Sequence, residues 1–357
     1  MFQDHPHYPI TVATCEDRNR SLRIRPLTPN DGEAASLFRV QDPFGLRKAI
    51  VPMFHADERE ILTGMGTGFA LDPWGRFLTA DHVIDFVRTA EIDRDGNYVS
   101  TAANHLLGLL GFGLVFGTVT TPPAATIHLT SYFTPAIERE NPLDFSGRPA
   151  RIPYDIAIVG SMASPGAEYI RTLPLRARPP SPRVGDLVVA IGFPQIELAR
   201  GELPELPTAL TEGMFAAYGV VTDHFPTGRD SANPTPVFEV SANWPSGMSG
   251  GPVLNAQGEV VGLVSRSMAP DDGDEVGVAW ASWLAASVAP SMLPPSLEDG
   301  DPFHRQAWCA YRSEPWALEG FPSTEDEAKI LTKDLGSEFV TRKASWRLGT
   351  DTYTIFG

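Results

Sequence analysis

The stretch PSGMSGGPV, residues 245–253, places Ser249 among glycines and between two segments that are typical of β-strands. A turn of this composition exposes the serine hydroxyl and leaves backbone N–H groups free to converge. An acyl-transfer reaction needs such N–H groups, because they stabilise the negative oxygen of its tetrahedral intermediate. We therefore expect Ser249 to be a nucleophile, with the backbone amides of Gly247 and Ser249 as its oxyanion hole.

A serine hydroxyl is a weak nucleophile at neutral pH, so it needs a base that takes its proton and a third group that orients that base. His82 follows a predicted strand at residues 76–79, and Asp155 precedes an apolar, β-branched run at residues 156–159. Both are candidates for these roles. Taken alone, each candidate has a plainer interpretation: His82 as a helix cap, Asp155 as a surface carboxylate and Ser249 as part of an ordinary hairpin turn.

Three segments resemble the signatures of chymotrypsin-like serine peptidases and follow one another in that family's His, Asp, Ser order. They are TADHV (79–83), DIAIV (155–159) and GMSGGP (247–252). Three more segments resemble the bacterial branch that includes the HtrA-type peptidases, namely RVGDLVVAIG (183–192), TEG (211–213) and GEVVGL (258–263). The residues after 288 lack the Gly-rich carboxylate-binding loop of the PDZ domain that HtrA-type peptidases usually carry.

This resemblance implies an all-β fold of two antiparallel six-stranded β-barrels, with the active site between them. His82 and Asp155 would come from the first barrel and Ser249 from the second. The expected organisation is an N-terminal extension (1–60), a peptidase domain (61–288) and a C-terminal tail (289–357). Within the domain we expect barrel 1 at 61–163, a proline-rich linker at 164–183 and barrel 2 at 184–288.

Two helices are expected outside the barrel strands. A short one is predicted at residues 280–288, at the end of the second barrel. A second is predicted in the tail, where residues 323–326 (STED) resemble a helix N-cap with an acidic first turn and the helix would continue to about residue 335. The tail is therefore expected to be a small α+β unit, with Trp308, Trp316 and Trp346 as its core or, alternatively, as a partner-binding surface.

The family resemblance also assigns a pocket for the substrate residue that precedes the cut bond. It places Asn243, six residues before the nucleophile, at the base of this pocket and Gly277 in its wall. Ser265, Arg266 and Ser267 would run along the substrate's backbone. Because the pocket would hold no carboxylate, a strict preference for Arg or Lys is not supported, and we expect a small or medium uncharged residue.

Composition restricts the class of partner. The formal net charge of −16 argues against nucleic acid or an anionic membrane. Cys15 and Cys309 lie close to opposite ends of the chain, so neither a metal site nor a disulfide framework is predicted.

The N-terminus lacks the pattern of a secretory signal, and the most apolar stretch, residues 106–119, is too short to span a membrane. We expect a cytoplasmic protein without metal or cofactor.

The sequence thus predicts a serine endopeptidase that hydrolyses peptide bonds in protein or peptide substrates through an acyl-enzyme intermediate. The alternative from another class is a binding or scaffold module on the same fold, with substrate access blocked by residues 90–150 or by the tail. Because no site for removal of a propeptide is visible, activation by a protein partner is a further hypothesis.

Overall fold

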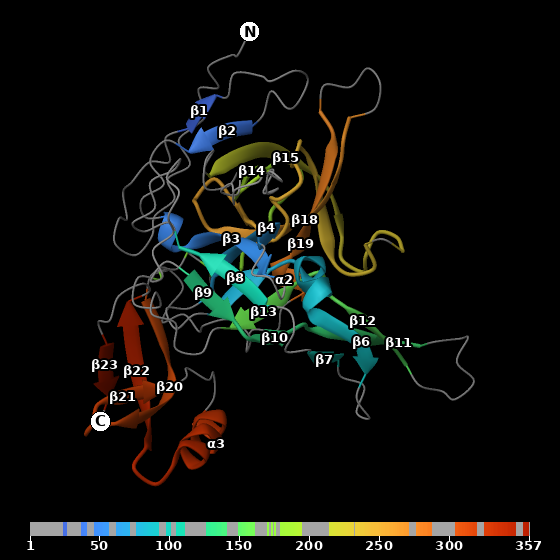
Figure 1. The fold of residues 1–357 in the computed structure, drawn as a ribbon. Helices are drawn as coiled ribbons and strands as arrows, with labels where there is room; N and C mark the ends of the chain where they lie inside the picture. The colour runs from blue at the N-terminus through green and yellow to red at the C-terminus, as the bar shows by residue number, and fades with distance from the viewer. Residues whose placement is uncertain are drawn as a thin grey trace, which may run out of the picture.

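The computed structural model describes residues 24–26, 37–40, 46–56, 62–71, 76–92, 98–100, 105–110, 126–140, 149–160, 170, 173, 175, 179–194, 214–231, 233–270, 276–287, 304–319, 325–347 and 353–356. In these residues the chain is mostly β-strand, and it forms two barrels and a small C-terminal unit (Figure 1). The expected all-β class, with two barrels and an α+β tail, is confirmed.

The first barrel is an antiparallel sheet in the order β10-β13-β5-β4-β3-β8-β9. Its strands are β3 (Ile50–Ala56), β4 (Leu62–Ala70), β5 (Arg76–Thr79), β8 (His105–Leu109), β9 (Thr126–Leu129), β10 (Ser131–Phe133) and β13 (Ala157–Gly160). The two edge strands, β9 and β10, are consecutive in the chain, so the sheet curls almost into a closed barrel. Apolar side chains of Phe54, Phe69 and Phe77 are fully buried in its core.

Shorter elements flank the first barrel. They are the 3₁₀ helices η1 (Leu46–Lys48) and η2 (Asp81–Val87), the strand pair β6 (Arg88–Ile92) and β7 (Tyr98–Ser100), and the strand pair β11 (Ala136–Arg139) and β12 (Ala150–Pro153). Strand β3 lies within residues 1–60, the segment expected to be an extension, yet it pairs with both β4 and β8. The first barrel therefore begins before residue 61, and this boundary is corrected.

The second barrel is closed, because β15 pairs with β14 on one side and with β16 on the other. Around the ring its strands are β15 (Phe215–Phe225), β14 (Leu187–Gly192), β17 (Pro252–Leu254), β18 (Val260–Met268), β19 (Val278–Trp283) and β16 (Val237–Ser241). β2 (Leu37–Val40) adds to the start of β15, and β1 (Ile24–Pro26) pairs with β2. Part of the expected N-terminal extension is thus a two-strand addition to the second barrel.

The helix expected at residues 280–288 is shorter than predicted. Residues 280–283 belong to β19, and the helix α2 covers only Leu284–Ser287. β19 pairs with both β16 and β18, and its residues from Ala279 to Ala281 are all buried. A strand buried on both faces shows no alternation of polar and apolar residues, so its sequence does not distinguish it from a helix.

The C-terminal unit is a sheet in the order β21-β20-β22-β23 with one helix packed on it. Its elements are β20 (His304–Arg312), β21 (Ala317–Glu319), α3 (Glu325–Leu335), β22 (Val340–Arg347) and β23 (Tyr353–Phe356). The tail helix therefore lies where its N-cap pattern predicted it.

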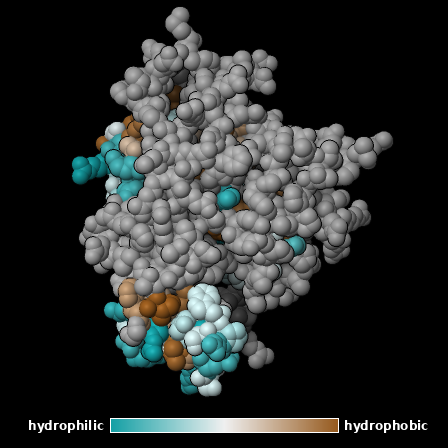
Figure 2. All heavy atoms as spheres, turned by 90° about the vertical axis from the view of Figure 1, so that its left-hand side faces the viewer, coloured by the Kyte–Doolittle hydropathy of each residue, from teal (hydrophilic) through white to brown (hydrophobic). Residues whose placement is uncertain are grey.

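One of the three tail tryptophans does not belong to a core. Trp316 is 56% exposed, whereas Cys309, Ala310 and Ala328 are fully buried. In Figure 2 the C-terminal unit, at the bottom, shows hydrophobic residues between hydrophilic ones. Among the described residues of this unit, the fully buried ones are thus small rather than large and aromatic.

Among the described helices, none combines the length and the apolar character that crossing a membrane requires.

Candidate active site

His82 lies in η2, which directly follows strand β5 of the first barrel. The next residues, Val83 and Ile84, are buried in the core and anchor this short helix. The preceding residue, Asp81, is buried and accepts a hydrogen bond of 2.5 Å from the Thr134 hydroxyl. The imidazole of His82 is 33% exposed, so part of the ring is accessible to solvent.

Asp155 lies just before β13, the strand that pairs with β5, and this pairing brings it beside His82. The backbone N–H of His82 donates to Asp155 Oδ1 at 3.1 Å. Nδ1 of His82 lies 2.9 Å from Oδ1 and 3.0 Å from Oδ2 of the same carboxylate. Since a carboxylate only accepts, Nδ1 carries the proton and Nε2 faces away from Asp155.

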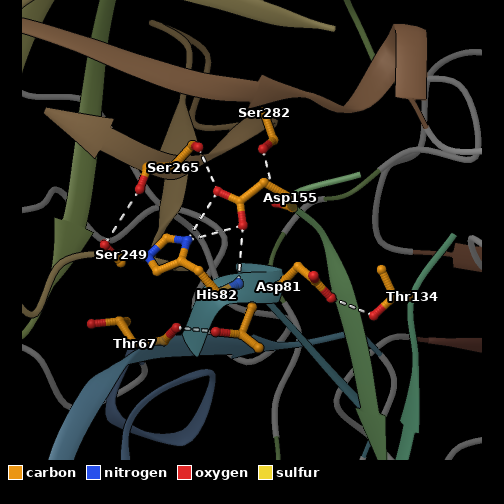
Figure 3. A network of polar contacts seen from close by, with 9 residues as sticks. Thr67, Asp81, His82, Thr134, Asp155, Ser249, Ser265 and Ser282 are labelled. Carbon is orange, nitrogen blue, oxygen red and sulfur yellow. Dashed lines mark hydrogen bonds and ion pairs between the residues drawn. The ribbon is translucent and has the colours of Figure 1, made fainter. Parts of the chain in front are cut away.

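Two serines of the second barrel complete the surroundings of Asp155 (Figure 3). Ser265 of β18 donates its hydroxyl to Asp155 Oδ2 at 2.5 Å. Ser282 of β19 donates its hydroxyl to the backbone carbonyl of Asp155 at 2.9 Å. The carboxylate that orients the first barrel's histidine is therefore itself oriented by the second barrel.

The two ionisable groups shift each other's pKa. Burial lowers the pKa of His82, but the hydrogen bond and negative charge of Asp155 outweigh burial and hold this pKa above its ordinary value. Burial raises the pKa of Asp155, but the hydrogen bond and charge of His82, helped by Ser265, hold it below its ordinary value. Each group thus favours the charged form of the other.

Ser249 lies in the turn before β17, between the two barrels. Its backbone carbonyl accepts a hydrogen bond of 2.7 Å from the N–H of Thr67, a residue of the first barrel. Its hydroxyl donates to the carbonyl of Ser265 at 3.4 Å, which is long for a bond between oxygens. Figure 3 shows this hydroxyl on the side of the imidazole that faces away from Asp155. Ser249 is thus linked through Ser265 to Asp155, which in turn bonds His82.

The backbone around Ser249 turns sharply. Gly247 and Gly250 have φ angles of 92° and 83°, which residues with a side chain rarely adopt. The amides of Met248, Gly250 and Gly251 donate to backbone carbonyls, at 3.2, 2.8 and 2.9 Å. For the amides of Gly247 and Ser249, no acceptor is found within the described residues. These are the two amides that the sequence predicts as the oxyanion hole.

The residues predicted to contact substrate also lie near the turn. The side-chain oxygen of Asn243 accepts from the N–H of Gly277 at 2.7 Å, so these two residues are directly linked. Arg266 and Ser267 are exposed in the second half of β18, where Ser267 donates its hydroxyl to the carbonyl of Trp244. Their contact with substrate stays a prediction.

Sequence reasoning missed three parts of this arrangement. It assigned Ser265 to the substrate's backbone, which stays a prediction, and did not find that the buried side chain of Ser265 bonds Asp155. It gave no role to Ser282 or to Thr67. A serine or threonine in a strand has no spacing signal that marks a contact with a residue of another barrel, so the sequence alone offered little to find them.

No group of three or more His, Cys, Asp or Glu side chains in the described residues forms an arrangement that could hold a metal ion. A serine hydroxyl, an imidazole fixed by a carboxylate and two backbone amides without an acceptor among the described residues are parts that acyl transfer requires.

Comparisons with known proteins agree with this geometry. The trypsin-like peptidase domain family matches residues 66–263, more than half of the chain. A relative from Rhizobium meliloti (strain 1021), described as "Probable periplasmic serine endoprotease DegP-like", is 35% identical over 120 residues, which cover 33% of this chain and 20% of the relative. The chain thus matches about a fifth of that relative's length.

A solved structure, "Crystal structure of Rv3671c protease, inactive form", is 18% identical, with coverage of 66% of this chain and 84% of that chain and a TM-score of 0.36. At this TM-score the likeness supports no conclusion about the present chain. The family match, which includes the turn at Ser249, stands independently of it. The chain therefore belongs to the trypsin-like peptidase family.

Proposed function

We propose that this chain is a serine endopeptidase that hydrolyses peptide bonds through an acyl-enzyme intermediate. Ser249 Oγ attacks the scissile carbonyl while Nε2 of His82 accepts its proton. The amides of Gly247 and Ser249 donate to the resulting oxyanion. The imidazolium returns the proton to the leaving amine, and water then attacks the acyl-enzyme with His82 again as base.

The observation that carries this proposal is the bonding of His82. Two contacts from the imidazole and one from its backbone N–H hold it on a single carboxylate, with Nε2 directed away from Asp155. A histidine that merely capped a helix would not need a buried carboxylate, because a buried charge is costly unless it is fully bonded. The proposed role of Asp155 is to fix the tautomer and to stabilise the imidazolium.

The position of the Ser249 hydroxyl bears on the alternative, a binding or scaffold module on the same fold. Its bond of 3.4 Å to the Ser265 carbonyl is weak and directs the proton away from His82. Catalytic hydrogen bonds are often long before substrate binds, so this geometry fits a resting enzyme. It also fits a restrained one that a protein partner would activate, and the experiment below separates the two.

The proposed substrate is a protein or peptide with a small or medium uncharged residue before the cut bond. Support comes from Asn243 and Gly277, whose mutual hydrogen bond brings an amide rather than a carboxylate to the position assigned to the pocket base. The cytoplasmic location expected from the sequence stays a prediction, and the Rhizobium meliloti relative is described as periplasmic.

A fluorophosphonate probe tests the proposal, because it reacts covalently with an activated serine. The purified protein would be labelled and the adduct located by mass spectrometry, alongside His82→Ala. The matched control is His128→Ala, which removes an exposed histidine of β9. We expect labelling at Ser249 in the wild type and the control, and a loss of at least about a thousandfold in rate for His82→Ala.

Labelling elsewhere, or equal labelling of Ser249 in His82→Ala, would contradict the assignment. A folded wild-type protein that does not label at all would favour the scaffold or partner-activated alternative. If the wild-type protein labels at Ser249, it is screened against peptide libraries. Cleavage mainly after Arg or Lys would overturn the proposed pocket.

A further inference from the structure

Thr67 is a fully buried residue of β4 that touches the nucleophile turn twice. Its backbone N–H donates to the carbonyl of Ser249 at 2.7 Å. Its hydroxyl donates to the carbonyl of Gly247 at 2.8 Å. Thr67 thus belongs to the first barrel but holds two carbonyls of a turn in the second.

The hydroxyl of Thr67 is itself fixed. It accepts a hydrogen bond of 3.1 Å from the N–H of Phe193, which follows β14 of the second barrel. The carbonyl of Thr67 accepts a hydrogen bond of 2.8 Å from the Thr79 hydroxyl. Donor and acceptor capacity of the Thr67 hydroxyl are therefore both used, and rotation about its χ1 angle would break both bonds.

These contacts determine how the turn presents its amides. A peptide unit is planar, so holding its oxygen and its N–H fixes its orientation. The unit between Gly247 and Met248 is held at the oxygen by Thr67 and at the N–H by the carbonyl of Pro245. The unit between Ser249 and Gly250 is held at the oxygen by Thr67 and at the N–H by the carbonyl of Val264.

The peptide units on both sides of the Met248–Ser249 peptide are thus fixed, and each has its oxygen on Thr67. The Met248–Ser249 unit, which carries the Ser249 amide, is held at its oxygen by the N–H of Gly251, and the described residues offer no acceptor for the amides of Gly247 and Ser249. Packing leaves little room for an alternative: a Cβ on Gly250 would lie 2.2 Å from the carbonyl of Thr67, and one on Gly192 would lie 2.9 Å from its hydroxyl.

We propose that Thr67 is a positioning residue that holds the nucleophile turn with its oxyanion amides directed at the substrate. This inference rests on the proposed function, since it concerns the same turn. Thr67 does not touch the reacting atoms; it acts through the carbonyls of Gly247 and Ser249. Its hydroxyl makes the oxyanion hole depend on the contact between the two barrels.

The test compares Thr67→Val, which keeps the shape but removes the hydroxyl, with Thr67→Ser, which keeps the hydroxyl. Thr235→Val is the matched control, because it also removes a buried threonine hydroxyl, but one for which the described residues show no bond to the turn or to Thr67. Each variant is treated with a fluorophosphonate, and two quantities are measured: the second-order rate constant and the final labelled fraction. Loss of folded protein lowers the fraction, whereas a misdirected oxyanion hole lowers the rate constant.

For Thr67→Val we expect a rate constant about 10- to 100-fold below wild type with an unchanged labelled fraction, a loss somewhat smaller than that from deleting an oxyanion donor outright. Thr67→Ser and Thr235→Val are expected within about threefold of wild type. If Thr67→Val does not fold, Thr67→Cys replaces it, since a thiol is a weak donor, and its rate constant is expected about tenfold or more below that of Thr67→Ser.

A wild-type rate constant in Thr67→Val, or in Thr67→Cys in its place, overturns the inference while leaving the proposed function intact. An equal fall in Thr235→Val also overturns it, because the loss would then follow the removal of any buried hydroxyl. A wild-type protein that does not label overturns the proposed function and the inference with it.

Discussion

Ser265 and Ser282 form a natural pair for measuring what the second barrel contributes to Asp155. Both are 2% exposed and lie on neighbouring strands. Ser265 bonds the charged carboxylate at 2.5 Å, whereas Ser282 bonds the neutral backbone carbonyl at 2.9 Å. Replacing either by alanine removes one hydroxyl at equal burial, so the two variants differ mainly in the charge of the acceptor.

A hydrogen bond to a charged group contributes about 1.5–3 kcal/mol, and one between neutral groups about 0.5–1.5 kcal/mol. At pH 8 the free energy of unfolding should therefore fall by about 1.5–3 kcal/mol in Ser265→Ala and by about 0.5–1.5 kcal/mol in Ser282→Ala. The pKa of Asp155 lies below its ordinary value of 3.8, so its stabilising charge is present above this pH and is lost as the pH falls through the folded-state pKa. Protonation turns the Ser265 bond into a neutral one, and its loss should shrink to the Ser282 range.

Urea-induced unfolding followed by tryptophan fluorescence, in a series from pH 8 down to the lowest pH at which the protein stays folded, measures both effects. The Ser282→Ala loss should stay constant across the series. Equal losses for the two variants at pH 8 would refute the reasoning. So would a Ser265→Ala loss that stays constant although the series passes below the folded-state pKa of Asp155.

Three further predictions concern single residues. The rate of fluorophosphonate labelling should rise with pH through a midpoint above 6.5, the ordinary pKa of histidine, because the neutral form of His82 is the proposed base and its pKa is raised. Asp155→Asn should move this midpoint to lower pH. An unmoved midpoint would contradict the pairing of His82 with Asp155. In urea titrations, Gly250→Ala should lower the free energy of unfolding more than Gly185→Ala. Both glycines have positive φ, 83° and 91°, but a Cβ would meet other atoms at 2.2 Å at Gly250 and none within 4 Å at Gly185. Equal losses would contradict this reasoning. Burial raises the pKa of Cys309 to about 11, so at pH 8 iodoacetamide should modify this thiol in the unfolded protein but not in the native one. Peptide mass mapping measures the modification. Rapid modification of the native protein would contradict the burial of this thiol.

The sequence predicted those parts of the fold and site that carry local signals. Strand β5 has the predicted bounds: residues 76–79 show a strand pattern that ends at the first residue of the TADHV segment. The helix in the tail was found from its N-cap. The pairing of His82 with Asp155 was expected only from the family resemblance, since the residues alone did not show that the chain returns to one point.

Features that depend on distant partners could not be predicted in this way. β1 and β2 are short, and the partner of β2 is β15, far along the chain, so no local period marks them. The bonds from Ser265 and Ser282 to Asp155 cross from one barrel to the other. In each case the partner lies far away in the sequence, so the pattern of neighbouring residues does not indicate the contact.

The bonding of Asp155 has a consequence for the time at which the site is assembled during synthesis. Ser265 and Ser282 stand 110 and 127 residues after Asp155 in the chain. A ribosome therefore releases His82 and Asp155 well before it releases the groups that complete their surroundings, and domains fold as units during synthesis. A half-made chain thus lacks both Ser249 and the support of the Asp155 carboxylate, so under the proposed function the site is completed only after the second barrel has been made.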